Sequence, residues 1–268
     1  MNQVVGRFNS HMKEALLVFA NEAVWGGDKV AEGTLKAMIT DRETAIEFKG
    51  KDIVWVQNYK RLIVASNESW AAPVDLDDRR YLILDVAETH KEDHGYFLAI
   101  KSELEQGGYE ALMHELLERD ISTFNPRRRP RTGAGLDMKL RGNPLAAFWF
   151  HCLSEGEIPA PHEHDHSIEL SETESITVGK KTLRDRYWQY CRRLGVKYTE
   201  SPEQFTKGLK KLCRVGIKKS TKPTGRTSDD REPSYVIPLL PECRTFFEQA
   251  VKHTGISWDD GSEDQQAA

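Results

Sequence analysis

The chain has 268 residues, a formal net charge of -4 and four scattered cysteines without a Cys-x-x-Cys pair. The length favours two domains, and the cysteines favour buried thiols over a disulfide framework or a zinc site. No stretch approaches the ~20 apolar residues of a membrane helix, and the first residues lack the apolar core of a signal peptide, so we expect a cytoplasmic protein without a membrane partner.

The first predicted element is a strand at residues 16–22, with the sequence Leu-Leu-Val-Phe-Ala-Asn-Glu. Five apolar residues followed by Asn21 and Glu22 indicate a strand that is buried on both faces and ends at the carboxyl edge of a parallel sheet. Carboxylates at this edge hold magnesium and polarise the attacking water in nucleotide hydrolases. The alternative is a buried strand that merely ends in two polar residues.

A phosphate-binding loop of the form G-x-x-x-x-G-K-[ST] would accompany such a strand in a P-loop ATPase. The sequence does not contain this loop: Ala45 stands where Gly50 and Lys51 would require the first glycine, and residues 179–182 have the wrong spacing. The short stretch before residue 16 leaves no room for the loop and its strand. We therefore expect the phosphate-binding half of the site to lie on another polypeptide or to be lost.

Residues 29–40 have the apolar spacing of a helix, and residues 44–48 and 53–57 predict two strands of a hairpin. Lys49 and Lys51 lie at the predicted tip of this hairpin. They suit a loop that grips a nucleic-acid backbone, or else an ordinary solvated turn.

A second buried strand is predicted at residues 61–66, followed by Asn67, whose amide suits a phosphate oxygen or an attacking water. Arg79 and Arg80 precede a third predicted strand at residues 81–86. Paired arginines at this position are either a salt-bridged strand terminus or groups that read phosphate. Two helical stretches, near 94–106 and 109–119, are expected to close this domain.

Taken in order, these elements resemble the superfamily-three helicase domain of phage and plasmid primase-polymerases, a relative of poxvirus-type primase-helicases. The resemblance rests on the strings Ala-Asn-Glu-Ala-Val-Trp-Gly-Gly-Asp-Lys at 20–29 and Leu-Ile-Val-Ala-Ser-Asn at 62–67, and on Asn-Pro-Arg at 125–127. It covers most of residues 1–250. It implies the carboxyl-terminal part of a partial P-loop (AAA+-like) ATPase core that lacks the Walker A loop.

The resemblance also implies roles for single residues. Glu22 would be the Walker B glutamate that activates water, and Asn67 the polar sensor beside the γ-phosphate. Arg79 or Arg80 would be an arginine finger that reaches the ATP of a neighbouring subunit. The complete enzyme would then use ATP and Mg²⁺ and would work as a homo-oligomeric ring such as a hexamer, or with a partner chain that carries Walker A.

By the same resemblance, Lys49 and Lys51 would lie on a DNA-gripping hairpin. Asn21 departs from the family, because many of its ATPases carry an aspartate at this place. This departure weakens the magnesium and ATP site that is expected at Asn21 and Glu22.

The composition changes after residue 124. Residues 125–142, rich in Arg, Pro and Gly, predict an extended basic connector, and 144–153 predict a packing helix. The His-rich stretch 162–166 lies on a Pro-rich loop, where a solvated acidic loop is expected in place of a metal site. From 180 to 226 the chain has fifteen Lys and Arg against three Asp and Glu, and this local charge of +12 indicates a polyanion partner.

This basic segment has the pattern helix, turn, helix, hairpin. Ser201 and Gln204 form an N-terminal capping signature for the second helix. A winged helix-turn-helix docks its second helix on DNA, so DNA contacts are expected from the following basic residues of that helix and the wing: Lys207, Lys210, Lys211, Arg214 and Arg226. The alternative is a basic helical face that is simply solvated.

We therefore expect an α/β protein with the following parts: the distal part of a helicase ATPase core with a parallel sheet at 1–124, a linker with a packing helix and an acidic loop at 125–165, a smaller α+β winged helix-turn-helix domain at 166–255, and a disordered acidic tail at 256–268. The expected function is the carboxyl-terminal portion of a phage-type replicative DNA helicase/primase, inactive alone. The alternative is a non-catalytic DNA-binding protein that uses the basic domain.

Overall fold

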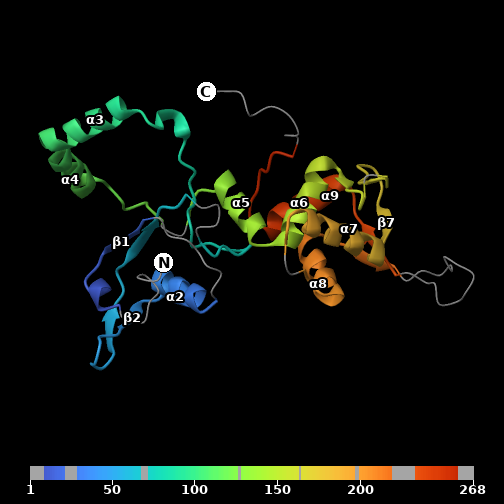
Figure 1. Ribbon diagram of the computed structural model, residues 1–268, viewed down its shortest axis with the longest axis horizontal. Helices are drawn as coiled ribbons and strands as arrows, with labels where there is room; N and C mark the ends of the chain where they lie inside the picture. The colour runs from blue at the N-terminus through green and yellow to red at the C-terminus, as the bar shows by residue number, and fades with distance from the viewer. Residues whose placement is uncertain are drawn as a thin grey trace, which may run out of the picture.

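The computed structural model describes residues 9–21, 29–67, 72–125, 128–162, 164–196, 199–218 and 233–258. Within these ranges, buried apolar side chains gather in two clusters, one between Met12 and Met38 and a larger one between Leu136 and Val251. The two clusters correspond to the blue and the yellow-green-to-red parts of Figure 1. The chain has mixed α/β structure with small sheets, one of them parallel.

The first part contains a short 3-10 turn, a helix and two strand pairs. Its elements are η1 (Ser10–Met12), β1 (Leu17–Ala20), α2 (Lys29–Thr40), β2 (Glu43–Ile46), β3 (Val54–Gln57) and β4 (Arg61–Val64). β2 and β3 form the antiparallel hairpin that the sequence predicts, and β1 and β4 pair in parallel. Leu17 lies opposite Arg61 and Ala20 opposite Val64, so both strands end at one edge of their sheet.

Among the described residues, one face of the β1–β4 sheet is covered by a helix. Ala20 is buried on that face, together with Leu35 and Met38 of α2. Leu17 and Phe19 point to the other face and are exposed. The expectation that this strand is buried on both faces is therefore wrong, because within the described residues α2 supplies a layer on one face and no second layer covers the other.

The third predicted strand, at residues 81–86, is also wrong: this segment is extended but pairs with no strand among the described residues. Its backbone is held by side chains, since Arg129 donates to the Tyr81 carbonyl and Thr132 to the Ile83 carbonyl. Leu84 and Val86 are exposed. This apolar run stays extended but unpaired, because no neighbouring strand of the described chain completes a ladder with it.

Two helices project from the first part (Figure 1). After a 3-10 turn, η2 (Glu88–His90), the chain forms α3 (His94–Glu103), the π-turn η3 (Leu104–Gly108) and α4 (Tyr109–Glu118). The helices form where the sequence predicts them, but neither contains a buried residue. The expectation that they close the domain is wrong, because no residue of either helix is buried against the rest of the described chain.

The second part has a continuous core built by five helices and two small sheets. Its elements are α5 (Gly133–Arg141), α6 (Pro144–Glu155), β5 (Glu157–Ile158), β6 (Ile168–Glu169), β7 (Ile176–Gly179), α7 (Lys180–Arg193), α8 (Pro202–Leu212), β8 (Gly216–Lys218), β9 (Ser234–Ile237) and α9 (Leu240–Ala250). β5 pairs with β6, and the antiparallel order of the other sheet is β7-β9-β8. The largest fully buried side chains of this core are Trp149, Tyr187, Tyr235, Phe148, Phe205 and Phe247.

The four cysteines, at positions 152, 191, 213 and 243, are free and buried, as the sequence predicts. Within the described ranges, every helix is too short or too polar to cross a bilayer.

Lys139 is an unusual buried cation of the second part, with 3% of its surface exposed. Its Nζ donates to the Val251 carbonyl at 2.6 Å, which ties α5 to the end of α9. Burial, assisted by the nearby charge of Arg129, lowers the pKa of Lys139 from 10.5 to about 8. The folded protein therefore holds this proton less tightly than the unfolded chain does.

We expect Lys139→Met to change how stability depends on pH. Between pH 8 and 10.5 the unfolded chain binds more protons at Lys139 than the folded chain, so the native free energy of unfolding should rise with pH in this window, relative to the variant. Urea unfolding of both proteins at pH 7, 8, 9 and 10 measures the difference. Parallel pH profiles of the two proteins would show that Lys139 does not titrate in this window.

Candidate functional site

The polar residues of the predicted nucleotide site follow β1 and β4. The amide of Ala65 donates to the carbonyl of Ala20 at 3.0 Å, so the parallel pairing continues to the last residues of the two strands. Asn21 and Asn67 come directly after these ends and are exposed. Glu22 lies outside the described residues. The structure thus brings the strands of the predicted site together at one sheet edge.

The described residues of this edge do not by themselves fit magnesium and ATP. Its described side chains are the neutral amides of Asn21 and Asn67, whereas Mg²⁺ prefers carboxylates together with substrate phosphates. Among the described residues, no group of three His, Cys, Asp or Glu side chains could hold a metal ion. The sequence also lacks a loop that could cradle phosphates.

The two candidate finger arginines have different surroundings. An Nη atom of Arg80 lies 3.3 Å from the buried carboxylate of Asp78, which also accepts from the Arg80 amide at 2.8 Å. Arg129 donates to the Asp78 carbonyl, so Arg80 belongs to a local network. Arg79 is exposed and makes no hydrogen bond or ion pair with another described residue. Of the two, Arg79 has the guanidinium that is available to another molecule.

Lys49 and Lys51 lie at the tip of the β2–β3 hairpin, as predicted, and both are exposed. Gly50 between them has φ +72°, a conformation that glycine adopts without steric cost. The Nζ of Lys51 lies 5.9 Å from the centroid of the Phe48 ring. The hairpin lies at the end of the molecule opposite α8 in Figure 1, so these lysines do not join the basic residues of the second part.

Helix α8 is positioned by its own sequence. Ser201 accepts from the Gln204 amide, and the Gln204 side chain accepts from the Ser201 amide, which completes a capping box at the start of the helix. Phe205 and Leu209 are buried against the core. Gly208 allows a close approach to α6, because a β-carbon there would lie 2.5 Å from Cδ2 of Leu145.

A basic concave surface of about 650 Å³ lies beside α8. Lys207 and Lys210 of α8, three residues apart and therefore on one helical face, form one side of it. Lys180, Lys181 and Arg184 of α7 form the other side. Among its described lining residues, Glu203 is the only acid. We call these five cations the basic cleft.

The helix dipole adds to the positive potential of the basic cleft. Lys180 and Lys181 occupy the first turn of α7, which contains no acidic residue, and Gly179 provides no side-chain cap. Cations at a helix N-terminus face the positive end of the macrodipole, an arrangement that costs about 0.3–1 kcal/mol per charge. The positive end of the macrodipole at the start of α7, together with these ammonium groups, also favours a bound anion.

Aromatic rings orient the cations of the cleft. The Nζ of Lys180 lies 5.3 Å from the Tyr235 ring centroid, and the guanidinium of Arg184 lies 4.9 Å from the Trp188 ring centroid. The hydroxyl of Tyr235 is hydrogen-bonded to Thr206 of α8 at 2.7 Å. These contacts connect β9, α7 and α8 around the cleft.

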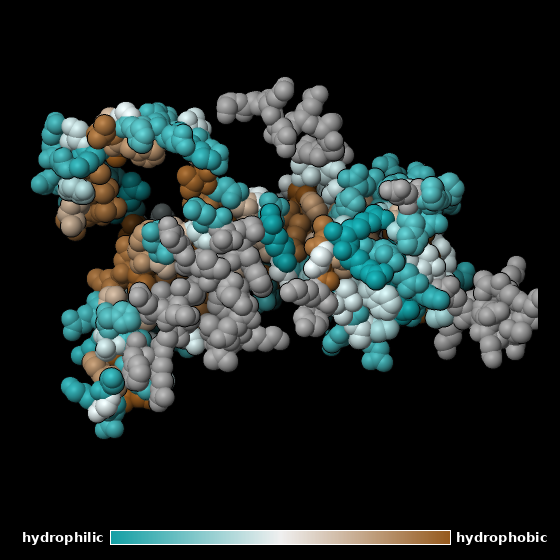
Figure 2. Space-filling view, viewed as in Figure 1, coloured by the Kyte–Doolittle hydropathy of each residue, from teal (hydrophilic) through white to brown (hydrophobic). Residues whose placement is uncertain are grey.

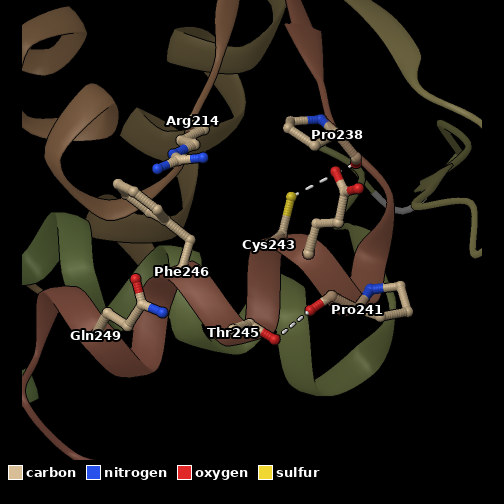
Figure 3. A pocket seen from close by; sticks show the side chains of 8 residues that line it. Arg214, Pro238, Pro241, Cys243, Thr245, Phe246 and Gln249 are labelled. Atoms are coloured by element: carbon tan, nitrogen blue, oxygen red, sulfur yellow. Dashed lines mark hydrogen bonds between the residues drawn. The ribbon is translucent and has the colours of Figure 1, made fainter.

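Arg214 lies elsewhere. It lines a separate concavity of about 470 Å³ beside α9, where its guanidinium lies 5.5 Å from the ring centroid of Phe246 (Figure 3). Lys211 is exposed on α8 but does not line the basic cleft. Arg226 lies outside the described residues. Of the predicted DNA contacts, the structure therefore gathers Lys207 and Lys210 in one cleft.

The sequence interpretation missed Lys180, Lys181 and Arg184 as binding residues, although it counted them in the basic segment. The available signal was the run of basic residues at the start of a helix, where acidic residues are the stabilising choice. Their convergence with α8 depends on how α7 packs, and the local pattern of charge does not contain that information.

Comparisons with known proteins give one family match and several similar structures. Residues 1–80 match a family of unknown function, DUF5906. No curated protein matches the chain. The fold is similar to the NrS-1 C terminal region (305-718) in its apo structure, with a TM-score of 0.52, 13% identity, and coverage of 88% of this chain and 58% of that chain.

The A form apo structure of the same NrS-1 region gives a TM-score of 0.50 and 15% identity, with coverage of 88% of this chain and 58% of that chain. The chain therefore spans less than two thirds of the NrS-1 region that it matches. At these identities the likeness shows a shared fold.

We expect Ser201→Ala to lower the free energy of unfolding by about 1 kcal/mol, because the N3 amide of α8 loses its side-chain acceptor. Thermal unfolding followed by circular dichroism measures the change. Thr173→Ala is the control, since Thr173 is an exposed loop residue outside every helix. An unchanged melting curve for Ser201→Ala would show that the capping box does not stabilise α8.

Proposed function

We propose that this chain is the carboxyl-terminal portion of a phage-type replicative DNA helicase/primase and that its second part binds DNA. The observation that carries the DNA-binding proposal is the basic cleft, where five cations from α7 and α8 converge around one acid. Phosphate backbones are recognised by such clusters of Lys and Arg. The fold shared with the NrS-1 C terminal region supports the view of a carboxyl-terminal piece.

The order of elements supports a winged helix-turn-helix within the second part. After α6 and the β5–β6 pair, the elements β7, α7, α8, β8 and β9 follow one another, and β9 lies between β7 and β8 in the sheet. In this proposal α8 presents Lys207 and Lys210 to DNA, and the β8–β9 pair is the wing. Lys211, Arg214 and Arg226 remain proposed contacts outside the basic cleft.

The first part is proposed to serve a nucleotide site in the complete enzyme. The parallel pairing of β1 and β4 supports roles for Glu22 in activating water and for Asn67 as the sensor, since the two residues follow neighbouring strands. Arg79, exposed and unpaired among the described residues, is proposed as the arginine finger. Arg80 is proposed to have a structural role, because it pairs with the buried carboxylate of Asp78. Lys49 and Lys51 are proposed to touch the DNA backbone.

In the complete enzyme, ATP and Mg²⁺ would bind where Asn21 and Glu22 meet a phosphate-binding loop, and the magnesium would neutralise charge on the phosphates. Within this chain, Asn67 would orient a water and Arg79 would contact a nucleotide on a neighbouring subunit. These assignments need an assembly that the chain alone does not provide.

A non-catalytic DNA-binding protein is the second candidate. It is favoured by the location of the basic cleft, which is formed by residues of the second part alone. DNA binding would then need neither the nucleotide site nor a partner.

We expect Lys207→Gln combined with Lys210→Gln to raise the dissociation constant for a 20-base-pair DNA duplex on the order of tenfold. Removing two phosphate contacts should also make the salt dependence shallower by about 2 in the slope of log K against log salt. Fluorescence anisotropy of the full chain between 50 and 200 mM NaCl measures both.

The charge-matched control is Lys91→Gln combined with Lys101→Gln, two exposed lysines outside the second part. This control should bind as the native chain does. Equal effects of the two double variants would show that DNA binding depends only on the net charge of the protein. An unchanged salt slope for the cleft variant would contradict the proposed phosphate contacts.

We expect the purified chain to release no more phosphate from ATP in the presence of Mg²⁺ and single-stranded DNA than its Glu22→Gln variant does. The reason is the missing Gly-Lys loop, without which the β- and γ-phosphates have no cradle. A phosphate-release assay compares the two proteins. Turnover that is stimulated by DNA and lost in Glu22→Gln would contradict this expectation and favour an autonomous enzyme.

A further inference from the structure

Two of the four buried cysteines are in direct contact. The Sγ atoms of Cys213 and Cys243 lie 3.4 Å apart, although the two residues are 30 positions apart in the chain. Cys213 directly follows α8, and Cys243 lies near the start of α9, so the contact joins the ends of two helices. Cys152 and Cys191 are also buried, but the described residues offer them no such sulfur partner.

Hydrogen bonds give the two thiols different positions. The Cys243 thiol donates to the Pro238 carbonyl at 3.5 Å, as the dashed line in Figure 3 shows. A thiol has a single proton to donate, so Cys213 is the donor in the contact between the two sulfurs. The hydrogen bonds therefore run from Cys213 through Cys243 to Pro238, with the Cys243 sulfur in the middle.

The two sulfurs also differ in access. Figure 2 shows mostly hydrophilic residues on the face of the second part around α7 and α8, and the cysteines lie in the apolar core beneath. Cys243 lines the concavity of about 470 Å³ beside α9, together with Arg214 and Phe246. Cys213 does not line this concavity and is 0% exposed. A small reagent in the concavity therefore meets Cys243 first.

The environment of Cys213 keeps it protonated. The contact with Cys243, together with burial, raises the pKa of the Cys213 thiol. A thiolate is the reactive form of cysteine, so Cys213 is a poor first nucleophile. It is instead placed to react with Cys243 after Cys243 has been modified.

We propose that Cys213 and Cys243 form a reversible disulfide when a peroxide enters this concavity. A disulfide needs a sulfur–sulfur distance of about 2.05 Å, so the two sulfurs must move together by a further ~1.3 Å. In a reducing compartment the pair rests as two thiols, and its disulfide is transient. This inference does not rest on the proposed function, because neither cysteine lines the basic cleft.

The reaction has two balanced steps. First, the Cys243 sulfur attacks one peroxide oxygen and the O–O bond breaks. Cys243 becomes a sulfenic acid, and its thiol proton leaves with the other oxygen as water or an alcohol. Second, the Cys213 sulfur attacks the Cys243 sulfur, the S–S bond forms and the S–O bond breaks, and the departing hydroxide takes the Cys213 proton to give water. The two thiols together lose two electrons, which reduce the peroxide.

The disulfide closes a loop that contains β8 and β9. This loop of about 30 residues runs from the end of α8 to the start of α9 and includes the strand pair proposed as the wing. A cross-link across such a loop restricts the unfolded chain, which raises the stability of the folded form. Oxidation therefore makes the second part harder to unfold.

The test treats the full chain with hydrogen peroxide after the chain has been reduced and freed of reductant. Denaturation and alkylation without a reducing agent, followed by mass spectrometry, count the free thiols. We expect two of the four thiols to disappear and the peptides that contain Cys213 and Cys243 to be linked. The melting temperature, followed by circular dichroism, should rise by roughly 5 °C. Dithiothreitol should reverse both changes.

Variants distinguish the roles of the two sulfurs. Cys213→Ala removes the second thiol, so peroxide should leave Cys243 as a sulfenic acid that dimedone traps. Cys243→Ser keeps a donor for the Pro238 carbonyl and should give neither a disulfide nor a trapped sulfenic acid at Cys213. The matched control, Cys152→Ala combined with Cys191→Ala, should form the cross-link as the native chain does. Cys152→Ala alone replaces the control if the double variant does not fold.

Four results would overturn the inference. Four free thiols after peroxide treatment would show that the contact does not lead to a bond. A cross-link that contains Cys152 or Cys191, or that joins two chains, would show that the reaction does not follow the contact. Sulfenic acid trapped at Cys213 in Cys243→Ser would contradict the order of the two steps. An unchanged melting temperature of the cross-linked chain would show that the bond does not restrain α8 and α9.

Discussion

A series of aromatic contacts in the core of the second part determines which face of α8 points outward. Ring centroids of Phe148 and Tyr187 lie 5.4 Å apart, and those of Tyr187 and Phe205 lie 5.2 Å apart, which connects α6, α7 and α8. Such pairs prefer defined tilted geometries in addition to burying large areas. Because Phe205 points inward, Lys207 and Lys210 must point outward, and α7 places Lys180 beside them.

The first part lacks this kind of enclosure. Its small core, around Leu35 and Met38, covers one side of a two-stranded sheet. Side-chain hydrogen bonds from Arg129 and Thr132 hold the extended segment that leads to α3 and α4. Most of the buried apolar core, and the stability that comes from it, therefore lies in the second part. The sheet and helices of the first part leave apolar side chains exposed, and a complete α/β architecture would need additional protein layers.

Much of this fold could be predicted from the sequence, because its signals are local. The capping box at Ser201 and the stripe of Phe205 and Leu209 locate α8, and the parallel pairing of β1 and β4 follows from two apolar runs. Predictions failed where the outcome depends on a neighbour. The pattern at 81–86 is that of a strand, but a strand needs an adjacent ladder, and the apolar residues of β1 do not say whether a second layer exists.

In the candidate site too, some residues could be predicted from local sequence and others could not. Lys207 and Lys210 were predictable because helical spacing puts them on one face, whereas the contribution of Lys180, Lys181 and Arg184 depends on how α7 meets α8. Arg79 and Arg80 are adjacent in sequence, but only the buried carboxylate of Asp78 distinguishes them.

Gly208 marks a close approach of α8 to α6. Cδ2 of Leu145 on α6 lies within 2.5 Å of where a β-carbon at position 208 would be. Since each residue of an α-helix turns the chain by about 100°, inserting a single residue between Gly208 and Lys210 would swing the following lysine a quarter-turn or more around the axis. An insertion in this short stretch would therefore turn Lys210 away from Lys207, and the charged face of α8 would change although the net charge of the protein would not.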